Sequence, residues 1–335
     1  MERGERVRRA LAGGPVDRPP ISFWWHSFTR ENAADTLAAE TAEQFQRYAW
    51  DLIKIQSRAT SFAEGWGVRY RPSTAPAVSP VITERPVRSA ADLRRIRPLE
   101  PSEGALGEQL TLLRLVRRAV GPDVPILQTV FAPAMVLSYL LDPGPAGAAP
   151  LRDLIRAHGA DVHAALSAIR DTMAAYARAC LAGGADGIFL AVKAASADQM
   201  RRAEYEEFGL PYDRAVLDAA AGGWLNMLHL CGPHLYFDVV DGLPTPLVNW
   251  ALEPGNPTLA EGRDRSRRAV IGGVTPKPGL LDLSPEQVEA EVGAAIADTG
   301  GVRMMIGPGC SIPPDTPEAN LRAACAAVAR YRAGA

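Results

Sequence analysis

Cysteine is scarce in this chain of 335 residues, which has only Cys180, Cys231, Cys310 and Cys325. So few thiols in so long a chain exclude a disulfide framework of the kind that holds small secreted proteins together. Cys180 and Cys325 lie in alanine-rich helical patterns, where we expect them to be buried core residues. Cys231 and Cys310, in contrast, each follow an apolar run at the end of a predicted strand.

The chain also lacks an excess of charge of either sign and lacks long apolar runs. Its 36 basic and 38 acidic residues give a net charge of −2, so nothing predicts binding to nucleic acid or to a membrane surface. No apolar run reaches the roughly 20 residues that span a bilayer, and none follows the charged first residues as a signal peptide would require. We therefore expect a cytoplasmic protein whose core is built from the 47% of residues that are hydrophobic.

What the sequence does contain is an alternation of short apolar runs and amphipathic segments. The apolar runs are not interrupted by alternating polar residues, which is typical of parallel strands covered on both faces. The predicted strands are Pro20–Trp25, Asp51–Gln56, Val124–Val130, Gly187–Val192, Trp224–Leu230, Leu247–Ala251, Ala269–Val274 and Val302–Gly307. The predicted helices are Ala33–Tyr48, Gly107–Val120, Asp161–Leu181, Pro211–Gly222, Ser284–Asp298 and Pro317–Tyr331.

Eight strands with helices between them predict an α/β protein with a (β/α)₈ fold, a TIM barrel. A doubly wound open sheet is the alternative, but it needs a point where the strand order reverses, and the sequence reveals none. No Gly-x-Gly-x-x-Gly loop follows a predicted strand either.

Two connections, residues 57–101 and 133–160, are longer than barrel loops usually are. Loops of this length are usually functional or carry structure of their own, so we expect extended loop or helical insertions in both. No tandem repeat, low-complexity tail or linker divides the chain. The sequence therefore predicts a single domain over residues 1–335.

A histidine and two cysteines are the strongest candidates for chemistry. His229 and Cys231, two residues apart at a strand end, should point to the same face. Cys310 follows the last predicted strand in a Gly-Pro-Gly-Cys turn. Because barrel active sites lie at the carboxyl ends of the strands, we expect all three in one mouth, where they suit a soft metal such as zinc. The alternatives are ordinary core residues or a structural zinc, although structural sites usually have four protein ligands.

Six further residues at or near strand ends are predicted to bind substrate: Trp24, His26, Arg58, Gln128, Lys193 and Asn249. For Trp24 the alternative is core packing. For Gln128, Lys193 and Asn249 the alternative is hydrogen bonding to the backbone of the barrel. Arg58 is expected to hold an anionic group, because a guanidinium pairs well with carboxylate, sulfonate or phosphate, and a surface ion pair is its alternative.

Three stretches of the chain resemble the uroporphyrinogen decarboxylase-like superfamily. Arg6–Pro20 is similar to the opening of these proteins, Val124–Leu140 to their third strand and following helix, and Gly309–Leu321 to their C-terminal run. The resemblance covers nearly the whole chain and implies a (β/α)₈ barrel.

One branch of that superfamily decarboxylates a tetrapyrrole, and its catalytic pattern is missing here. Its catalytic aspartate, in a Phe-Ser-Asp after the second strand, corresponds to a position in Gln56-Ser57-Arg58. Its arginine-rich loop after the first strand corresponds to Trp24–Arg30, which retains one arginine. These differences argue against a porphyrinogen substrate.

The other branch transfers methyl groups to thiols, using zinc held by a His-x-Cys and a distant Cys. It includes corrinoid-dependent methyltransferases that act on coenzyme M and, more distantly, cobalamin-independent methionine synthase. The resemblance implies that His229, Cys231 and Cys310 bind Zn²⁺ and are catalytic. Glu253 lies 22 residues past Cys231, a spacing similar to that of a glutamate ligand in methionine synthase, and is predicted as a fourth, displaceable ligand. Its alternative is a solvent-facing side chain.

The sequence thus predicts a zinc-dependent methyltransferase that activates a small thiol as a zinc thiolate. Zinc deprotonates a thiol that it binds, and two cysteinates neutralise the metal, so a further thiolate stays nucleophilic. The methyl donor is either a corrinoid carried by a partner protein or a small methylated molecule. A decarboxylase or lyase, a non-catalytic zinc- or corrinoid-binding protein and a zinc hydrolase are the alternatives. We expect a monomer or a homodimer.

Overall fold

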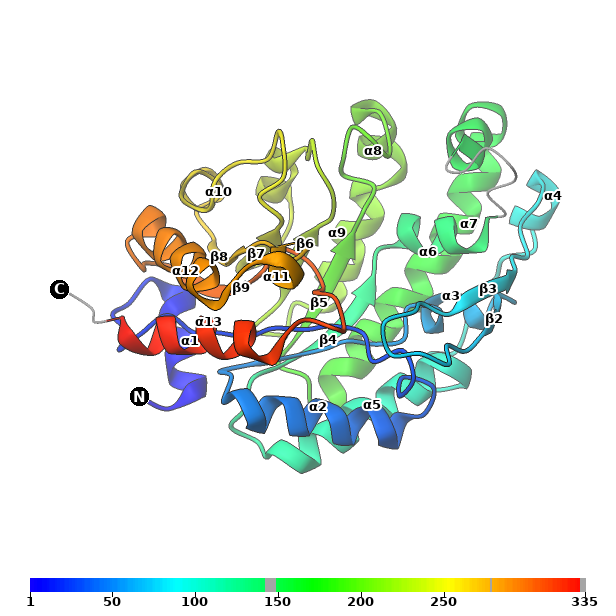
Figure 1. Cartoon of the computed structure of the whole chain (residues 1–335). Coiled ribbons are helices and arrows are strands. Elements are labelled where there is room, and N and C mark those ends of the chain that lie inside the picture. The colour runs from blue at the N-terminus through cyan, green and yellow to red at the C-terminus, as the bar shows by residue number, and fades with distance from the viewer. Residues whose placement is uncertain (142–148, 278, 332–335) are drawn as a thin grey trace.

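Seven parallel strands form one curved sheet at the centre of the molecule, and helices surround it (Figure 1). The computed structural model describes residues 1–141, 149–277 and 279–331. In spatial order the strands are β1 (Ile53–Ile55), β4 (Ile126–Phe131), β5 (Gly187–Val192), β6 (Met227–Leu230), β7 (Leu247–Trp250), β8 (Ala269–Val274) and β9 (Met304–Pro308). This order follows the chain and never reverses, as in a barrel and unlike a doubly wound sheet.

The eighth position of the barrel is filled by residues 20–25, which do not form a regular strand. Ile21 makes an isolated parallel bridge to Ile306 of β9. On the other side, the Asp51 N–H donates to the Ile21 carbonyl at 2.9 Å. Pro20 at the start of this segment, and Pro19 just before it, have no N–H to donate, which limits the ladder that the segment can form. The predicted strand Pro20–Trp25 is therefore wrong, because this segment lacks a regular hydrogen-bonded ladder. The predicted (β/α)₈ fold is confirmed.

Helices follow most strands, and all six predicted helices are present with shifted ends. The longer helices are α1 (Arg3–Ala12), α2 (Ala34–Tyr48), α5 (Gly104–Val120), α6 (Pro133–Leu140), α7 (Ala149–Ala182), α8 (Arg202–Phe208), α9 (Leu210–Ala219), α10 (Leu259–Ser266), α12 (Pro285–Thr299) and α13 (Glu318–Arg330). The short ones are α3 (Ser61–Glu64), α4 (Ala90–Leu93), α11 (Gly279–Asp282) and the 3₁₀ turn η2 (Phe237–Gly242). No helix within the described residues has the length and apolarity needed to cross a bilayer.

The two long connections contain secondary structure. Residues 57–101 include α3, α4 and a small antiparallel pair, β2 (Arg69–Arg71) with β3 (Val81–Glu84). Residues 133–160 include α6 and the first part of α7, while 142–148 lie outside the described residues. Both connections follow strand ends on the side of the barrel mouth.

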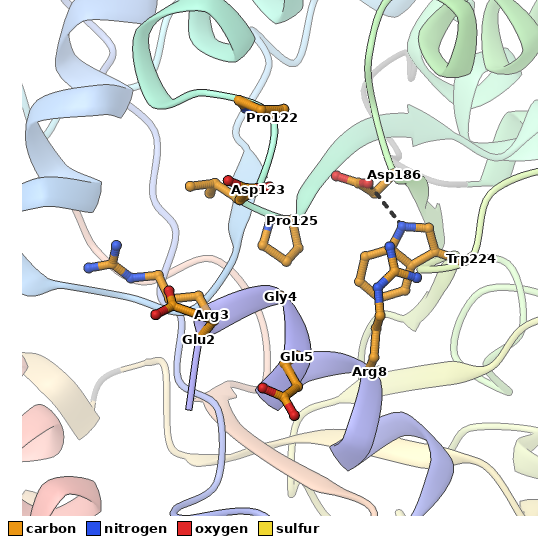
Figure 2. Close-up of a pocket in the computed structure, with 11 residues that line it drawn as sticks. Glu2, Arg3, Gly4, Glu5, Arg8, Pro122, Asp123, Pro125, Asp186 and Trp224 are labelled. Carbon is orange, nitrogen blue, oxygen red and sulfur yellow. Dashed lines mark hydrogen bonds between the residues drawn. The ribbon is translucent and has the colours of Figure 1, made fainter.

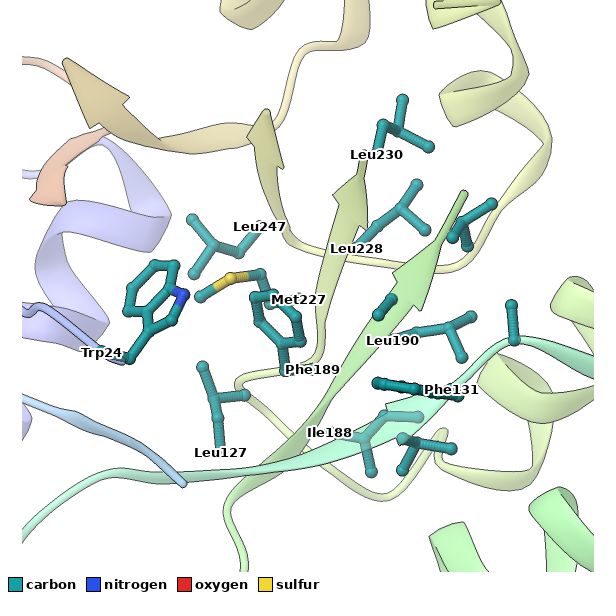
Figure 3. Packing of buried hydrophobic residues seen from close by; sticks show 14 of the residues in the cluster. Trp24, Leu127, Phe131, Ile188, Phe189, Leu190, Met227, Leu228, Leu230 and Leu247 are labelled. Carbon is teal, nitrogen blue, oxygen red and sulfur yellow. The ribbon is translucent and has the colours of Figure 1, made fainter. Parts of the chain in front are cut away.

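Strand register divides the side chains of the sheet between an inner and an outer face. Phe189 pairs with Met227, and Ala191 pairs with His229, so these four side chains share one face. Buried side chains on this inner face lie near Trp24: Leu127, Phe189, Met227 and Leu247 (Figure 3). Buried side chains on the outer face lie toward the helices: Ile188, Leu190, Leu228 and Leu230 (Figure 3).

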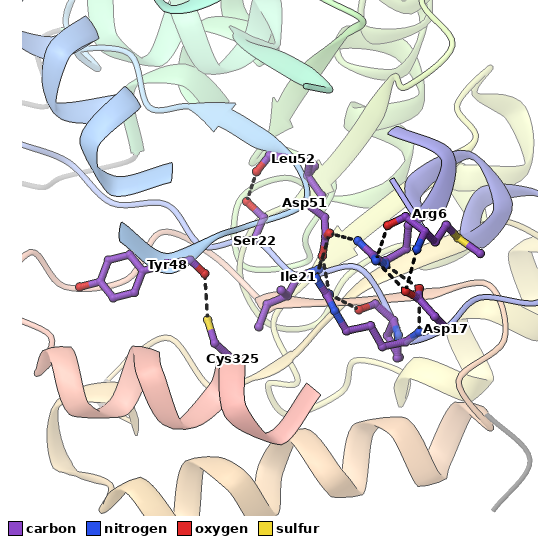
Figure 4. A network of polar contacts seen from close by, with 11 residues as sticks. Arg6, Asp17, Ile21, Ser22, Tyr48, Asp51, Leu52 and Cys325 are labelled. Atoms are coloured by element: carbon purple, nitrogen blue, oxygen red, sulfur yellow. Dashed lines mark hydrogen bonds and ion pairs between the residues drawn. The ribbon is translucent and has the colours of Figure 1, made fainter. Parts of the chain in front are cut away.

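A buried ion-pair network joins the N-terminal residues to the barrel (Figure 4). Arg6 donates to Asp17 at 2.7 Å and to Asp51 at 2.6 Å. Asp51, which is fully buried just before β1, also accepts from Arg18 at 2.6 Å and from the Ile21 N–H at 2.9 Å. One carboxylate therefore links α1, the irregular eighth segment and β1.

Candidate metal centre

His229, Cys231 and Cys310 converge at the carboxyl ends of β6 and β9. One ligand atom from each residue, an imidazole nitrogen and two sulfurs, lies within 4.8 Å of the other two. His229 is buried and both cysteines are half-buried. Zinc–ligand bonds of about 2.0–2.3 Å place such atoms on one ion after small side-chain movements. The structure thus brings together the three residues that the sequence predicted as ligands.

Backbone contacts fix the position of Cys231. Its N–H donates to the Val192 carbonyl at 2.8 Å, which extends the β5–β6 pairing one residue beyond the end of β6. Gly232 then turns the chain with a φ of 103°, a conformation that favours glycine. The alternation along β6 is therefore maintained through Cys231, which keeps its side chain on the same face as that of His229.

Close packing of Gly309 fixes the position of Cys310. A Cβ at Gly309 would lie 2.4 Å from the Cα of Ala251, so no side chain fits between β9 and the end of β7. The Gly309 N–H donates to the Val274 carbonyl at 3.3 Å. The Gly-Pro-Gly-Cys turn is thus the sequence that lets Cys310 approach the other two ligands.

Asn249 of β7 orients His229. The Asn249 amide nitrogen donates to the carbonyls of Ile271 at 2.7 Å and Pro308 at 3.0 Å, so its oxygen faces His229 Nδ1 at 2.7 Å. An amide oxygen only accepts, so Nδ1 carries the hydrogen and Nε2 is left to bind a metal. Asn249 was predicted to bind substrate, but it is fully buried and bonded to the barrel backbone, which was its alternative.

The two cysteines are electrostatically coupled. The hydrogen bond to Cys310, together with burial, raises the pKa of Cys231. The same bond lowers the pKa of Cys310 well below its usual range, with a further contribution from His229. This bond therefore favours the thiolate form at Cys310 and the thiol form at Cys231. Because zinc binds thiolates, metal binding would release the remaining proton.

Lys193 and Glu253 lie near Cys231, and both side chains are exposed. Beyond its bond to Cys310, Cys231 experiences the charge of Lys193, which lowers its pKa, and that of Glu253, which raises it. Within the described residues, Glu253 does not belong to the group of converging ligand atoms. The structure therefore brings three predicted ligands together and leaves Glu253 facing solvent, which was its alternative. Lys193 directly follows β5 at the mouth.

Arg58 is held by two carboxylates. Its guanidinium bonds to Glu64 at 2.9 Å and to Glu108 at 2.7 Å, and the residue is only 3% exposed. These contacts keep the pKa of Arg58 raised against the effect of burial. Its charge is already matched, as in the ion-pair alternative, although the pair is buried and not on the surface.

Gln128 lies on the outer face of the sheet, not in the mouth where it was predicted. It pairs with Ile188 in the β4–β5 ladder, and Ile188 faces the helices. Its amide donates to the hydroxyl of Tyr176 in α7 at 3.2 Å. Strand alternation explains the correction, because a shift of one residue in register moves a side chain to the opposite face.

Trp24 and His26 lie on the segment that closes the barrel. Trp24 is buried and packs edge-on against Phe189, with 5.8 Å between ring centroids, as in its core-packing alternative. His26 accepts at Nε2 from Gln56 at 2.8 Å, so its Nδ1 donates to Glu31 at 2.9 Å. His26 is thus bonded on both sides within the protein.

Lys54 and Gln56 are two polar residues of this region that sequence reasoning missed. The Lys54 ammonium donates to the Gln56 side-chain oxygen and lies 4.3 Å from the centroid of the Phe189 ring. Burial lowers the pKa of Lys54 to about 7. The available signal was a lysine inside the apolar run Asp51–Gln56, where a cation is unusual.

A surface cavity of about 500 Å³ lies at the opposite, amino ends of the strands (Figure 2). The Arg8 guanidinium stacks over the Trp224 ring at 3.6 Å, and the Trp224 indole N–H donates to Asp186 at 2.9 Å. Barrel enzymes place their chemistry at the carboxyl ends. We therefore take the cluster of His229 and the two cysteines as the candidate site.

The family model described as uroporphyrinogen decarboxylase (URO-D) matches residues 2–331. The chain belongs to the uroporphyrinogen decarboxylase family. One relative in this family is a methylcobamide:CoM methyltransferase, MtbA of Methanosarcina acetivorans, 25% identical over 336 residues that cover 95% of each chain. Another is the uroporphyrinogen decarboxylase of a Synechococcus species, 27% identical over 345 residues that also cover 95% of each.

Solved structures show the same fold. A methyltransferase from Methanosarcina mazei superposes with a TM-score of 0.85 at 20% identity and covers 98% of both chains. A B12-independent methionine synthase from a Shewanella species has a TM-score of 0.57 at 14% identity and covers 94% of this chain and 93% of its own. The relatives of this member of the uroporphyrinogen decarboxylase family have two different activities, at similar sequence identity to this chain. Overall similarity therefore does not decide between the two activities, and the residues of the site must do so.

Proposed function

We propose that this member of the uroporphyrinogen decarboxylase family is a zinc-dependent methyltransferase that activates a thiol acceptor. The observation that carries the proposal is the convergence of His229, Cys231 and Cys310 in the mouth of the barrel. The methylcobamide:CoM methyltransferase relatives support methyl transfer as the reaction class.

The residues of the cluster fit a zinc ion. His229 would bind through Nε2 and the cysteines through their thiolates, and three protein ligands leave one position open for substrate, as in catalytic zinc sites. When bound, zinc would supply the Lewis acidity that keeps an acceptor thiol deprotonated at neutral pH.

The surrounding residues prepare the site for sulfur chemistry. Asn249 keeps His229 in the tautomer that presents Nε2. The two cysteine thiolates would neutralise the metal charge, so an acceptor sulfur would retain its electron density. Phe189 stacks on the His229 ring, with 5.1 Å between centroids, and with Met227 forms an apolar wall that limits the access of water.

Two methyl donors fit this proposal, a methylcorrinoid on a partner protein and a small methylated molecule. The relatives that are methylcobamide:CoM methyltransferases favour the corrinoid. The partner protein would dock at the carboxyl ends of the strands, because the cluster lies there.

Decarboxylation of a porphyrinogen is less well supported. The position of the decarboxylase aspartate lies within Gln56-Ser57-Arg58, and the guanidinium of Arg58 is occupied by Glu64 and Glu108. We therefore expect no turnover of uroporphyrinogen by the purified protein.

The metal content of purified variants tests the ligand assignment. We expect about one zinc per chain, as a single three-ligand site implies. Cys231→Ser and Cys310→Ser should each lose most of it. Cys325→Ser removes a thiol that donates to the Tyr48 carbonyl instead, and should retain full zinc. Glu253→Gln should retain it too. Full zinc in both site variants would show that the assignment is wrong.

The coordination sphere tests thiol activation. X-ray absorption at the zinc edge should detect two sulfurs in the protein alone and three at a saturating concentration of an acceptor thiol. If no thiol from a broad panel adds a third sulfur, the site is structural or hydrolytic and the proposal fails.

A further inference from the structure

Lys54 is a buried cation inside the barrel that the proposed function does not use. It is one of three lysines in the chain and is 5% exposed. Lys54 pairs with Leu127, a side chain of the inner face, so Lys54 also points into the barrel. An ammonium buried among apolar residues is unfavourable unless negative charge or hydrogen-bond acceptors compensate for lost water.

The partners of Lys54 within the protein use only part of its bonding capacity. Among the described residues, its ammonium makes one hydrogen bond, to the oxygen of Gln56. Gln56 is held in turn by His26, and His26 by the buried carboxylate of Glu31. This series of bonds orients the ammonium without placing a carboxylate against it. An ammonium has three N–H donors, so two remain for another group.

The ammonium lies close to the candidate metal centre. It is 4.3 Å from the centroid of the Phe189 ring, and the His229 ring stacks on that same ring. Burial lowers the pKa of Lys54, and the negative charge of Cys310 opposes this shift with a smaller effect. Lys54 therefore lies within electrostatic reach of Cys310. One phenyl ring thus contacts both the cation and a candidate metal ligand.

We propose that Lys54 is the counter-charge of this site and that its free N–H donors face the negative charge of a ligand bound beside Cys310. The inference rests on the proposed function in that this ligand is the acceptor thiolate. Two cysteinates balance a zinc dication, so the acceptor thiolate adds one negative charge to an apolar interior. Lys54 supplies one positive charge there, which favours an anionic sulfur over a neutral one.

Alkylation of Cys310 tests the charge of Lys54 without requiring methyl transfer. Iodoacetate and iodoacetamide react with a thiolate in the same way but differ in charge. The full chain is treated with a chelator, each reagent is applied near pH 6.5, and modification of the Cys310 peptide is followed by mass spectrometry. We expect Lys54→Met to lower the iodoacetate-to-iodoacetamide rate ratio about fivefold, an effect in the range of one nearby charge.

Matched controls separate charge from structure. Lys54→Arg keeps the cation and should keep the ratio. Lys277→Met removes an exposed lysine, which solvent screens, and should also keep it. Replacing a buried cation by an apolar side chain is often stabilising, and thermal unfolding checks that each variant is folded. An unchanged ratio in folded Lys54→Met would overturn the proposal.

A second measurement distinguishes failure of this inference from failure of the proposed function. Protein loaded with cobalt(II) is titrated with 2-mercaptoethanol, and the increase in sulfur-to-cobalt absorption over that of the two cysteine ligands gives the dissociation constant. We expect about tenfold weaker binding in Lys54→Met at unchanged cobalt content, a factor equivalent to about 1.4 kcal/mol. Equal binding in both proteins overturns the inference alone. If 2-mercaptoethanol does not increase the band in the wild type, that result contradicts thiol activation and leaves the alkylation ratio to decide the role of Lys54.

Discussion

Asn249 decides which nitrogen of His229 is available for a metal. Its oxygen receives the Nδ1 hydrogen while its nitrogen is bonded to two backbone carbonyls. Supporting residues of this kind typically contribute a factor of 10–100 in metal affinity. We therefore expect Asn249→Ala to weaken zinc binding by about 10- to 100-fold, measured by competition with a chromogenic chelator.

Gln128→Leu is the matched control for that measurement, because Gln128 is an equally buried amide on the outer face of the same barrel. It should change stability without changing zinc affinity. Wild-type affinity in Asn249→Ala would show that His229 needs no orientation by its neighbour.

Asp213 of α9 gives a test at the scale of one secondary-structure element. Its carboxyl is fully buried, and it accepts from the hydroxyl of Tyr205 in α8 at 2.8 Å, while its other oxygen has no hydrogen bond within the described structure. Burial raises its pKa to about 7, from 3.8. The folded state therefore binds the proton more tightly than the unfolded state, and stability falls as pH rises from about 4 to about 7.

Asp213→Asn should remove this pH dependence, because an amide keeps the acceptor for Tyr205 and carries no charge. We expect the variant to gain about 2 kcal/mol more, relative to wild type, at pH 8 than at pH 5. Urea unfolding at the two pH values measures it. An equal gain at both would mean that the Asp213 carboxyl is already ionised in the folded protein at low pH.

Asp51 bonds to the segments that meet where the barrel closes. Its carboxylate binds Arg6, Arg18 and the backbone of Ile21, and so replaces part of the ladder that the eighth segment lacks. Removing one partner from a buried ion pair leaves an uncompensated charge and typically costs 3–5 kcal/mol. We expect Asp51→Asn to lower the free energy of unfolding by about 3 kcal/mol in urea.

Hydrogen exchange gives a local reading of the same change. The Ile306 N–H, which donates to the Pro20 carbonyl at 2.7 Å across the closure, should exchange faster in Asp51→Asn. Glu5→Gln, which breaks only an exposed pair with Arg9, should change stability by less than about 0.5 kcal/mol. If both variants are equally stable, the network does not close the barrel.

The sequence by itself determined the barrel and the convergence of three candidate metal ligands. Apolar runs that alternate with amphipathic segments predict parallel strands covered by helices. Residues two apart on a strand share a face, which placed His229 beside Cys231, and the carboxyl ends of parallel strands meet, which brought Cys310 to them. Both rules depend only on the alternation of side chains along a strand and on the direction of the strands. They therefore apply without knowledge of the register between strands.

Only the tertiary structure decided what the other polar residues do. Gln128 faces the helices, Asn249 supports His229, and Lys54 points into the barrel, because register assigns each strand position to a face. Arg58 is matched by Glu108 and Arg6 by Asp51, partners 50 and 45 residues away in the chain. Such pairs form only once the barrel brings distant segments together, so no spacing in the sequence predicts them.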